Sequence, residues 1–251
     1  FDRQGSRISL TESGNLLLEH CERILEDYKR LEYEMHLLHN EYTGGLKLGA
    51  STTIAQYVLP PLLASFIGKF PQVSLSLLNG NSREIEAALQ EHRIDLGFVE
   101  GVFRLPNIRY TTFLEDELVA VVRTGSKLAV GEEITPDELF HLPLVLRERG
   151  SGTLDVFERA LQQHNIKLSS LQVLMYLGST ESIKLFLEHT DCLGIVSVRS
   201  ITRELYSGQL RVVEIKGMPM LRDFSFAQPQ GQESGLAQVF MQFAMHNNHK
   251  L

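Results

Sequence analysis

The chain has 251 residues, of which 43% are hydrophobic and 22% are charged, and this balance excludes a disordered chain. Its length allows one large domain or two modest ones with real cores. The net charge of −7 provides no global basic field, so any contact with nucleic acid has to be local or come from a part of the protein outside this sequence.

Cysteine use and hydropathy indicate a compartment. The two cysteines, Cys21 and Cys192, are far apart and form neither a disulfide framework nor a Cys-x-x-Cys metal pair, which suits a reducing cytoplasm. No stretch reaches the roughly 18 consecutive apolar residues of a membrane span, and the first residues do not resemble a secretion signal. The sequence therefore predicts a cytoplasmic protein without a membrane partner.

The first 40 residues predict a hairpin followed by one long helix. Residues 1–10 alternate in polarity around a turn at Gln4-Gly5-Ser6, and because an isolated hairpin is marginal in water, we expect it to belong to a domain mostly absent from this chain. Thr11 is a good N-cap for a helix that runs to about Asn40. An apolar seam at alternating steps of four and three needs a partner, either a second copy of the chain or the chain's own domain. The seam consists of Leu17, Cys21, Ile24, Tyr28, Leu31, Met35 and Leu38.

After a linker at Thr43-Gly44-Gly45, strands and helices alternate in two similar rounds. Such alternation predicts an α/β fold with a mostly parallel sheet, and two rounds predict two lobes that face each other across a cleft. The first round has strands at 46–50, 73–78, 95–99, 108–113 and 118–122, with helices at 54–70 and 82–91. The second has strands at 143–146, 172–176, 192–196 and 210–215, with helices at 153–163, 180–188 and 200–206, and a strand at 224–227 and a helix at 236–246 close the chain.

Motifs for catalysis and for metal binding are missing from the sequence. It contains no Gly-x-Ser-x-Gly elbow, phosphate loop, His-Glu-x-x-His or Gly-x-Gly-x-x-Gly motif, and the nine histidines are scattered. We therefore expect no catalytic residue, no metal and no cofactor. An enzyme on the same fold remains an alternative, and it would use Glu100, Glu148 or Glu181 as acid or base.

Small hydroxyl and glycine residues gather where strands turn into helices. Free backbone N–H groups at such turns favour a carboxylate, phosphate or sulfate, although Ser and Thr there also serve as ordinary caps. Their recurrence in both rounds, at the carboxyl ends of strands, favours a ligand site. The residues are Ser51, Thr52 and Thr53; Gly150, Ser151, Gly152 and Thr153; and Ser179, Thr180 and Glu181.

Charged and amide side chains could complete this ligand site. Arg147 and Arg149 flank Glu148 just before the second turn, so we expect at least one arginine to face the cleft and pair with an anion. Asn79, Asn81 and Glu100 close strands of the first round, where turn formation explains them about as well as ligand contact. Cys192 lies in a buried-strand pattern that favours inert core packing.

Several motifs resemble the LysR-type transcriptional regulators over essentially the whole chain. Phe1-Asp2-Arg3 and the stretch Arg7 to Gly14 are similar to the wing and the following helix start of that family's winged helix-turn-helix domain. Further stretches look like successive landmarks of its effector-binding domain. These are Gly45 to Ser51, Leu59-Pro60, Phe66 to Pro71, Asp95 to Phe98, and Leu193 to Val196.

The resemblance implies an architecture and partners. It implies two Rossmann-like lobes of the periplasmic-binding-protein type, joined by two crossover strands, with lobe I at 45–121 and 223–251 and lobe II at 122–222. It implies a wing remnant at 1–14 that lacks the recognition helix, and a linker helix at 11–40 that forms a homodimer or homotetramer. Promoter DNA would be the partner of the full-length protein, with Arg3 and Arg7 at the positions that approach it.

The resemblance also bears on the ligand. The stretches 146–153 and 178–184 look most like regulators of sulfur, nitrogen or carbon assimilation, although many relatives carry Arg where this chain has Leu154. The leading hypothesis is a sensor of a small anionic metabolite, bound in the cleft, that alters DNA binding. The alternative is the solute-binding protein of a transporter, which would share the cleft.

Overall fold

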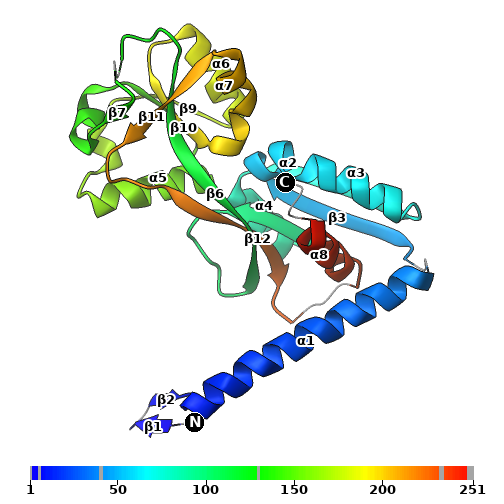
Figure 1. Cartoon of the computed structure of the whole chain (residues 1–251). Coiled ribbons are helices and arrows are strands. Elements are labelled where there is room, and N and C mark those ends of the chain that lie inside the picture. The colour runs from blue at the N-terminus through cyan, green and yellow to red at the C-terminus, as the bar shows by residue number, and fades with distance from the viewer. Residues whose placement is uncertain (1, 5–6, 40–41, 129–130, 232–234, 248–251) are drawn as a thin grey trace. The chain divides into compact units, whose positions relative to one another are not determined.

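A computed structural model describes residues 2–4, 7–39, 42–128, 131–231 and 235–247 of the chain. Backbone contacts divide it into two units, residues 1–44 and residues 45–251. Figure 1 shows the elements of both units.

The first unit contains the predicted hairpin and helix. Strands β1 (Asp2–Gln4) and β2 (Arg7–Ser9) pair antiparallel, and helix α1 spans Glu12–His39. The Oγ1 of Thr11 accepts a hydrogen bond from the Gly14 N–H at 3.0 Å, so Thr11 caps the helix as predicted. Along the predicted seam, Leu17 and Ile24 are 64% and 66% exposed. The side chains of Arg3, Arg7 and Leu38 lie outside the described residues.

The second unit is built on one long twisted sheet. Its strand order is β4-β3-β5-β12-β6-β10-β8-β9, with β11 beside β6 and the short β7 beside β11. The strands are β3 (Gly44–Ser51), β4 (Val73–Gly80), β5 (Leu96–Glu100), β6 (Ile108–Arg123), β7 (Glu133–Ile134), β8 (Leu144–Arg147), β9 (Val173–Leu177), β10 (Leu193–Ser197), β11 (Leu210–Ile215) and β12 (Leu221–Pro229).

Helices follow most of these strands, as the sequence predicted. The helix expected at 54–70 is divided at Val58 into α2 and α3, and the helix expected at 200–206 is a 3-10 turn followed by α7. The sequence did not predict β7 or the 3-10 turns at 136–141 and 168–170. The helices are α2 (Thr52–Tyr57), α3 (Leu59–Lys69), α4 (Ser82–Gln90), α5 (Gly152–Gln163), α6 (Thr180–His189), α7 (Thr202–Ser207) and α8 (Gly235–Asn247).

Two strands, β6 and β12, cross between the halves of the sheet (Figure 1). The first part of β6 pairs antiparallel with β12 from Ile108 to Glu117, and its last part pairs with β10 and β11. The prediction of separate strands at 108–113 and 118–122 was therefore wrong. The charged run 115–117 interrupts the apolar pattern, but β12 lies beside it and Asp116 is buried. Residues 118–121 of β6 pair with β10, beyond the part of β6 that pairs with β12.

The second half of the sheet is covered on both faces. Alternate residues of a strand point to opposite faces, and the two cores follow this period. Leu118, Ala120 and Val122 of β6 pack in one buried cluster with Phe157 of α5. Val121 lies in another buried cluster with residues of α6, so α5 and α6 cover opposite faces.

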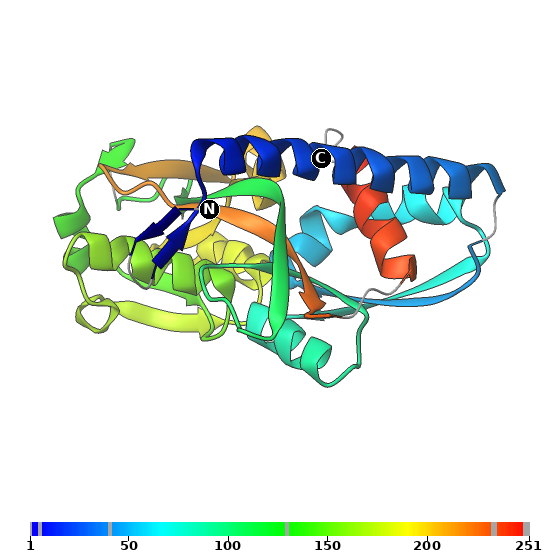
Figure 2. The same cartoon turned by 90° about the horizontal axis from the view of Figure 1, so that it is seen from below.

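The first half repeats this layered arrangement. Helix α4 packs on the face that carries Val99 of β5. On the other face, the Phe98 ring meets Phe226 of β12 at 5.2 Å and Phe240 of α8 at 5.9 Å between centroids. Phe240 also meets Phe66 of α3 at 4.8 Å, so α3 and α8 form one layer (Figures 1 and 2). These layers place the carboxyl ends of β3, β5 and β8 close to one another.

Two glycines allow the halves to touch backbone to backbone. A Cβ at Gly152, the first residue of α5, would lie 2.2 Å from the carbonyl oxygen of Glu100 at the end of β5. Gly101 has φ +112°, a conformation that favours glycine, and its own Cβ would lie 2.9 Å from the Gly152 Cα. No larger residue fits at this contact without moving one half away from the other.

We therefore expect Gly152→Ala to destabilise the chain by about 1–3 kcal/mol, the usual cost of overpacking. Chemical denaturation followed by circular dichroism measures this change. Gly68→Ala is the matched control because its Cβ would meet nothing within 4 Å in helix α3, so it should leave the stability unchanged or raise it slightly. Equal stability of the two variants would contradict the close approach.

Candidate functional site

Arg147, the last residue of β8, occupies the junction of the two halves and is only 1% exposed. Its Nε and Nη2 donate to the two carboxylate oxygens of Glu148 at 2.8 and 3.0 Å. Nη2 also lies 3.3 Å from the Thr52 Oγ1, in the first half, and 3.3 Å from the Gly178 carbonyl oxygen, in the second. Among the described residues, Nη1 has no hydrogen-bond partner. The guanidinium is thus buried and charge-compensated, with one donor left over.

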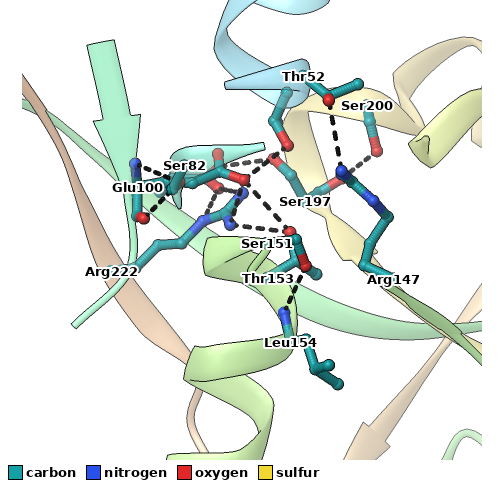
Figure 3. A network of polar contacts seen from close by, with 12 residues as sticks. Thr52, Ser82, Glu100, Arg147, Ser151, Thr153, Leu154, Ser197, Ser200 and Arg222 are labelled. Atoms are coloured by element: carbon teal, nitrogen blue, oxygen red, sulfur yellow. Dashed lines mark hydrogen bonds and ion pairs between the residues drawn. The ribbon is translucent and has the colours of Figure 1, made fainter. Parts of the chain in front are cut away.

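Ser51 and Thr52 form the matching edge of the first half, where β3 turns into α2. The Thr52 hydroxyl donates to the Gly80 carbonyl oxygen at 3.2 Å and accepts from Arg147 (Figure 3). Ser51 is 1% exposed, and its Oγ makes no hydrogen bond within the described part of the chain. Ser51 occupies the N-cap position of α2, but its side chain makes no capping hydrogen bond. The interpretation of Ser51 as an ordinary helix cap is therefore wrong.

At the other two turns, the serine side chains do cap the helices. The Ser151 Oγ accepts from the Leu154 N–H at 3.2 Å, and the Ser179 Oγ accepts from the Ser182 N–H at 3.1 Å. Both serines therefore cap their helices. Thr180, one residue further, is 1% exposed, so the start of α6 is buried, and its cap, Ser179, is half-buried.

A buried network lies beside Arg147 and is centred on Arg222 of β12 (Figure 3). The Arg222 Nη1 lies 3.2 Å from the Glu100 Oε1, and its Nε donates to the Asp116 Oδ2 at 2.7 Å. The Glu100 Oε1 also accepts from Thr53 at 3.2 Å and from Thr153 at 3.4 Å. One carboxylate therefore joins the first turns of α2 and α5 to a crossing strand.

The network extends to the second crossing strand. Asp116 of β6 accepts from the Ser197 hydroxyl at 2.7 Å, and Arg199 lies 3.6 Å from its carboxylate. Two carboxylates thus face two guanidinium groups, which compensates the charges that burial would otherwise penalise by several kcal/mol each. Among the described residues, the Glu100 Oε2 and the Arg222 Nη2 make no hydrogen bond, although Nη2 lies 2.7 Å from the Asp116 Oδ2.

Tyr57 and Glu181 form a further contact between the halves. The Tyr57 hydroxyl of α2 donates to the Glu181 carboxylate of α6, and the Lys184 Nζ lies 2.8 Å from the same carboxylate and 5.3 Å from the Tyr57 ring centroid. Burial, followed by the hydrogen bond to Glu181, raises the pKa of Tyr57. Burial alone would raise the pKa of Glu181, but hydrogen bonds from Lys184 and Tyr57 outweigh it and lower that pKa. Glu181 therefore stays ionised as a bridge rather than acting as an acid.

The structure brings together most of the residues that the sequence selected. Thr52 and Thr53 meet Arg147, Glu100 and Thr153 through the contacts described above, and Gly150 and Gly152 shape the turn beside them. Arg147, rather than the exposed Arg149, is the buried arginine. The role of these residues in ligand binding stays a prediction.

Asn81 fits the interpretation as a turn residue, whereas Asn79 lies within strand β4. Asn79 is exposed, and Asn81 forms a capping box with Glu84 at the start of α4, with hydrogen bonds of 3.0 and 2.9 Å. Asn81 still borders the site, because its Oδ1 would lie 3.2 Å from a Cβ at Gly150.

Sequence reasoning missed Arg222, Asp116, Ser197 and Lys184. Arg222 and Asp116 lie in charged stretches that are typical of solvent-facing residues, and Arg222 is remote in sequence from both of its partners, Asp116 and Glu100. Only the end of the strand at 193–197 offered a signal for Ser197, since ligands in α/β folds gather at such ends.

Searches of the described residues found neither a group of His, Cys, Asp and Glu suited to a metal ion nor a helix long and apolar enough to cross a membrane. Two α/β halves that are joined by paired crossing strands and meet at buried polar groups have the form of a ligand-binding module that closes around a small molecule.

Comparison with known proteins identifies the family. Residues 39–248 match the family model described as the LysR substrate binding domain. The chain is 35% identical to the HTH-type transcriptional regulator YeiE of Escherichia coli K12 over 86% of this chain and 71% of that protein. It is 29% identical to the RuBisCO operon transcriptional regulator of Acidithiobacillus ferrooxidans over 97% of this chain and 78% of that protein.

A solved structure agrees. The regulatory domain of CcmR from Synechocystis PCC6803, in complex with 2-PG, superposes with a TM-score of 0.73 at 28% identity, covering 81% of this chain and 97% of that one. The chain therefore belongs to the LysR family of transcriptional regulators and contains its effector-binding domain. Members of this family are regulators rather than enzymes or transporter components, and they sense a small molecule, bind promoter DNA and oligomerise.

We expect Arg222→Met to destabilise the chain by about 3–5 kcal/mol, because it leaves the buried Glu100 without its counter-ion and Asp116 with only the more distant Arg199, at 3.6 Å. The triple change Arg222→Met, Glu100→Gln and Asp116→Asn removes all three charges and should recover most of that loss. Chemical denaturation at neutral pH measures both. A single variant within about 1 kcal/mol of the unchanged chain would show that the network carries little stability.

Proposed function

We propose that this regulator senses a small anionic metabolite held between its two halves, with Arg147 as the anchor of the negative group. The alternative of a transporter's solute-binding protein has lost its support, since the family consists of transcriptional regulators. The ligand-contacting set is the one that the sequence selected around the turns at Ser51 to Thr53, Gly150 to Thr153 and Ser179 to Glu181.

The observation that carries this proposal is the unsatisfied donor of Arg147. A buried polar group without a hydrogen-bond partner costs about 1–3 kcal/mol of stability, and more when it is charged. Such a group in a folded protein therefore indicates a partner outside the chain, such as a bound ligand. The Nη1 of Arg147 and the Oγ of Ser51 are both in this state among the described residues, and Thr52 links the two by sequence and by hydrogen bond. An oxyanion of the ligand could accept from both.

The start of α6 supports the same chemistry. The backbone N–H groups in the first turn of a helix lack intrahelical partners, and the helix dipole favours negative charge there. Ser179 caps this helix of ten residues, and the adjacent Gly178 carbonyl oxygen already touches Arg147. The CcmR regulatory domain, 28% identical, has a structure with the small molecule 2-PG, which supports a ligand of similar size.

The two lobes, the wing remnant and helix α1 would transmit effector binding to DNA. Lobe I would comprise 45–121 and 223–251 and lobe II 122–222, and a ligand that contacts both would favour the closed arrangement by its differential affinity. The wing remnant at 1–14 would approach promoter DNA through Arg3 and Arg7, in the cytoplasm. Helix α1, the linker predicted at 11–40, would join two copies, as a homodimer or as part of a homotetramer.

A thermal-shift screen tests the effector proposal. The panel is sulfate, phosphate, acetylserine, citrate, 2-oxoglutarate and sugar phosphates, and a ligand at 100 times its Kd stabilises the folded state by about 2.7 kcal/mol. Arg147→Gln should weaken the binding of a hit about 10- to 150-fold, because a charged hydrogen bond contributes about 1.5–3 kcal/mol.

Arg149→Gln is the matched control, since this neighbouring arginine is exposed. Ser51→Ala, which removes only a hydroxyl, guards against a folding defect in the arginine variant and should also weaken the hit. Binding that survives both Arg147→Gln and Ser51→Ala would contradict the proposed anchor.

Oligomerisation through α1 has its own test. Leu17 lies on the predicted seam and Leu16 lies beside it, and they are 64% and 58% exposed in the single chain. Burying a leucine contributes about 1.5–3 kcal/mol, so Leu17→Glu, which acts twice in a dimer, should weaken dimerisation at least about 100-fold in sedimentation equilibrium. Leu16→Glu should leave it nearly unchanged, and the reverse order would refute the seam.

A further inference from the structure

A second hollow, separate from the proposed effector site, lies where the crossing strands leave the first half. Its volume is about 330 Å³, and none of the residues from the turns at 51–53 and 179–181 lines it. Its walls come from the loop after β5, from both crossing strands and from α5. The lining residues are Gly101, Val102, Arg104, Glu115, Asp116, Arg159, Leu221, Arg222 and Asp223.

Four of the charged side chains at this hollow lack a counter-ion. Arg104, Arg159, Glu115 and Asp223 make no ion pair within 4.0 Å in the described ranges of the chain. Arg104 donates only to the Gly101 and Phe103 carbonyl oxygens and to the Ser225 hydroxyl, each at 3.3 Å. Two cations and two anions therefore border one concavity without neutralising each other.

The hollow also has an apolar side. Leu221, at the start of β12, is 71% exposed, and Val102 is half-buried beside it. An exposed leucine on its own needs no explanation, but here it shares a pocket with separated charges of both signs. A ligand that satisfies all three features carries a positive group, a negative group and a short aliphatic part.

The floor of the hollow is shared with the buried network. Asp116 and Arg222 line it, and the same two residues pair with each other while Arg222 also pairs with Glu100, which holds the first turns of α2 and α5. The walls come from both halves, since α5 belongs to the second half and the loop after β5 to the first. A molecule bound here would therefore respond to the angle between the halves and influence it.

We propose that this hollow is a second ligand pocket, for a free α-amino acid with a short aliphatic side chain. The carboxylate would lie against Arg104 and Arg159, the ammonium against Glu115 and Asp223, and the side chain against Leu221 and Val102. The volume of about 330 Å³ falls at the lower end of the range for small-molecule pockets, about 300–1,000 Å³. The amino acid acts as a second signal, distinct from the anionic effector.

Thermal shift and calorimetry on the whole chain test this pocket. The probes are L-alanine, L-valine and L-leucine, each beside its amine-free and its carboxylate-free analogue. We expect at least one amino acid to bind and neither of its analogues to do so. Arg159→Gln and Asp223→Asn should each weaken this binding about 10-fold or more, because each removes a charged contact.

Two variants separate this pocket from the effector site. Arg149→Gln, an exposed arginine outside the hollow, should leave amino-acid binding unchanged. Arg147→Gln, which disables the effector anchor, should weaken amino-acid binding less than Arg159→Gln does, because it acts only through the angle between the halves. The proposal is overturned if no amino acid binds, if an analogue binds as well as its amino acid, or if Arg159→Gln retains full affinity. A larger loss of binding in Arg147→Gln than in Arg159→Gln would place the amino acid in the effector site and equally overturn it.

Discussion

The ion pairs of Arg222 with Glu100 and Asp116 hold together the place where the two halves of the protein meet. Arg222 lies on one crossing strand, Asp116 on the other, and Glu100 at the end of a strand of the first half. Buried charges are tolerated only when they are paired and hydrogen-bonded, so this cluster restricts how the two strands can shift past each other. Because Glu100 also binds Thr53 and Thr153, the joint is connected to two helix starts at the cleft.

The proposed effector site depends on the same arrangement. Arg147 touches Thr52 from one half and Gly178 from the other only because the crossing strands bring the carboxyl ends of β3 and β8 together. Its ion pair with Glu148 compensates the buried charge, and its Nη1 is the donor that we propose for a ligand. Binding of this kind needs no acid or base, which fits a family of regulators that respond by shifting between arrangements.

The proposed second pocket would allow a second ligand to affect the angle between the two halves. Its floor consists of the residues that pair across the crossing strands, so its shape and the angle of the halves are coupled. A regulator with an anion site on the helix starts and an amino-acid pocket at the strands would combine two metabolic signals in one movement. By linkage, each ligand would change the affinity for the other by the same factor.

The sequence by itself determined the order of most strands and helices and the membership of the family, and it predicts the seam of α1. Periodicity and caps are local properties, so Thr11, Asn81 and Ser151 could be recognised as helix starts from their neighbours alone. The set of turn residues at the cleft was also visible, because small hydroxyl residues recur at the ends of strands in both rounds.

Only the tertiary structure decided which of these residues are satisfied and which are not. Ser51 and Ser151 have similar sequence surroundings. Ser151 caps a helix, whereas the Ser51 hydroxyl is buried without a hydrogen-bond partner among the described residues. Asp116 and Arg222 are 106 positions apart, and each reads as a solvent-facing charge until β12 is laid beside β6. The pairing of β6 with β12 makes one strand of the two that the sequence predicted, and it brings Asp116 and Arg222 together. The sequence could not predict this contact, because a local pattern of polarity contains no information on long-range partners.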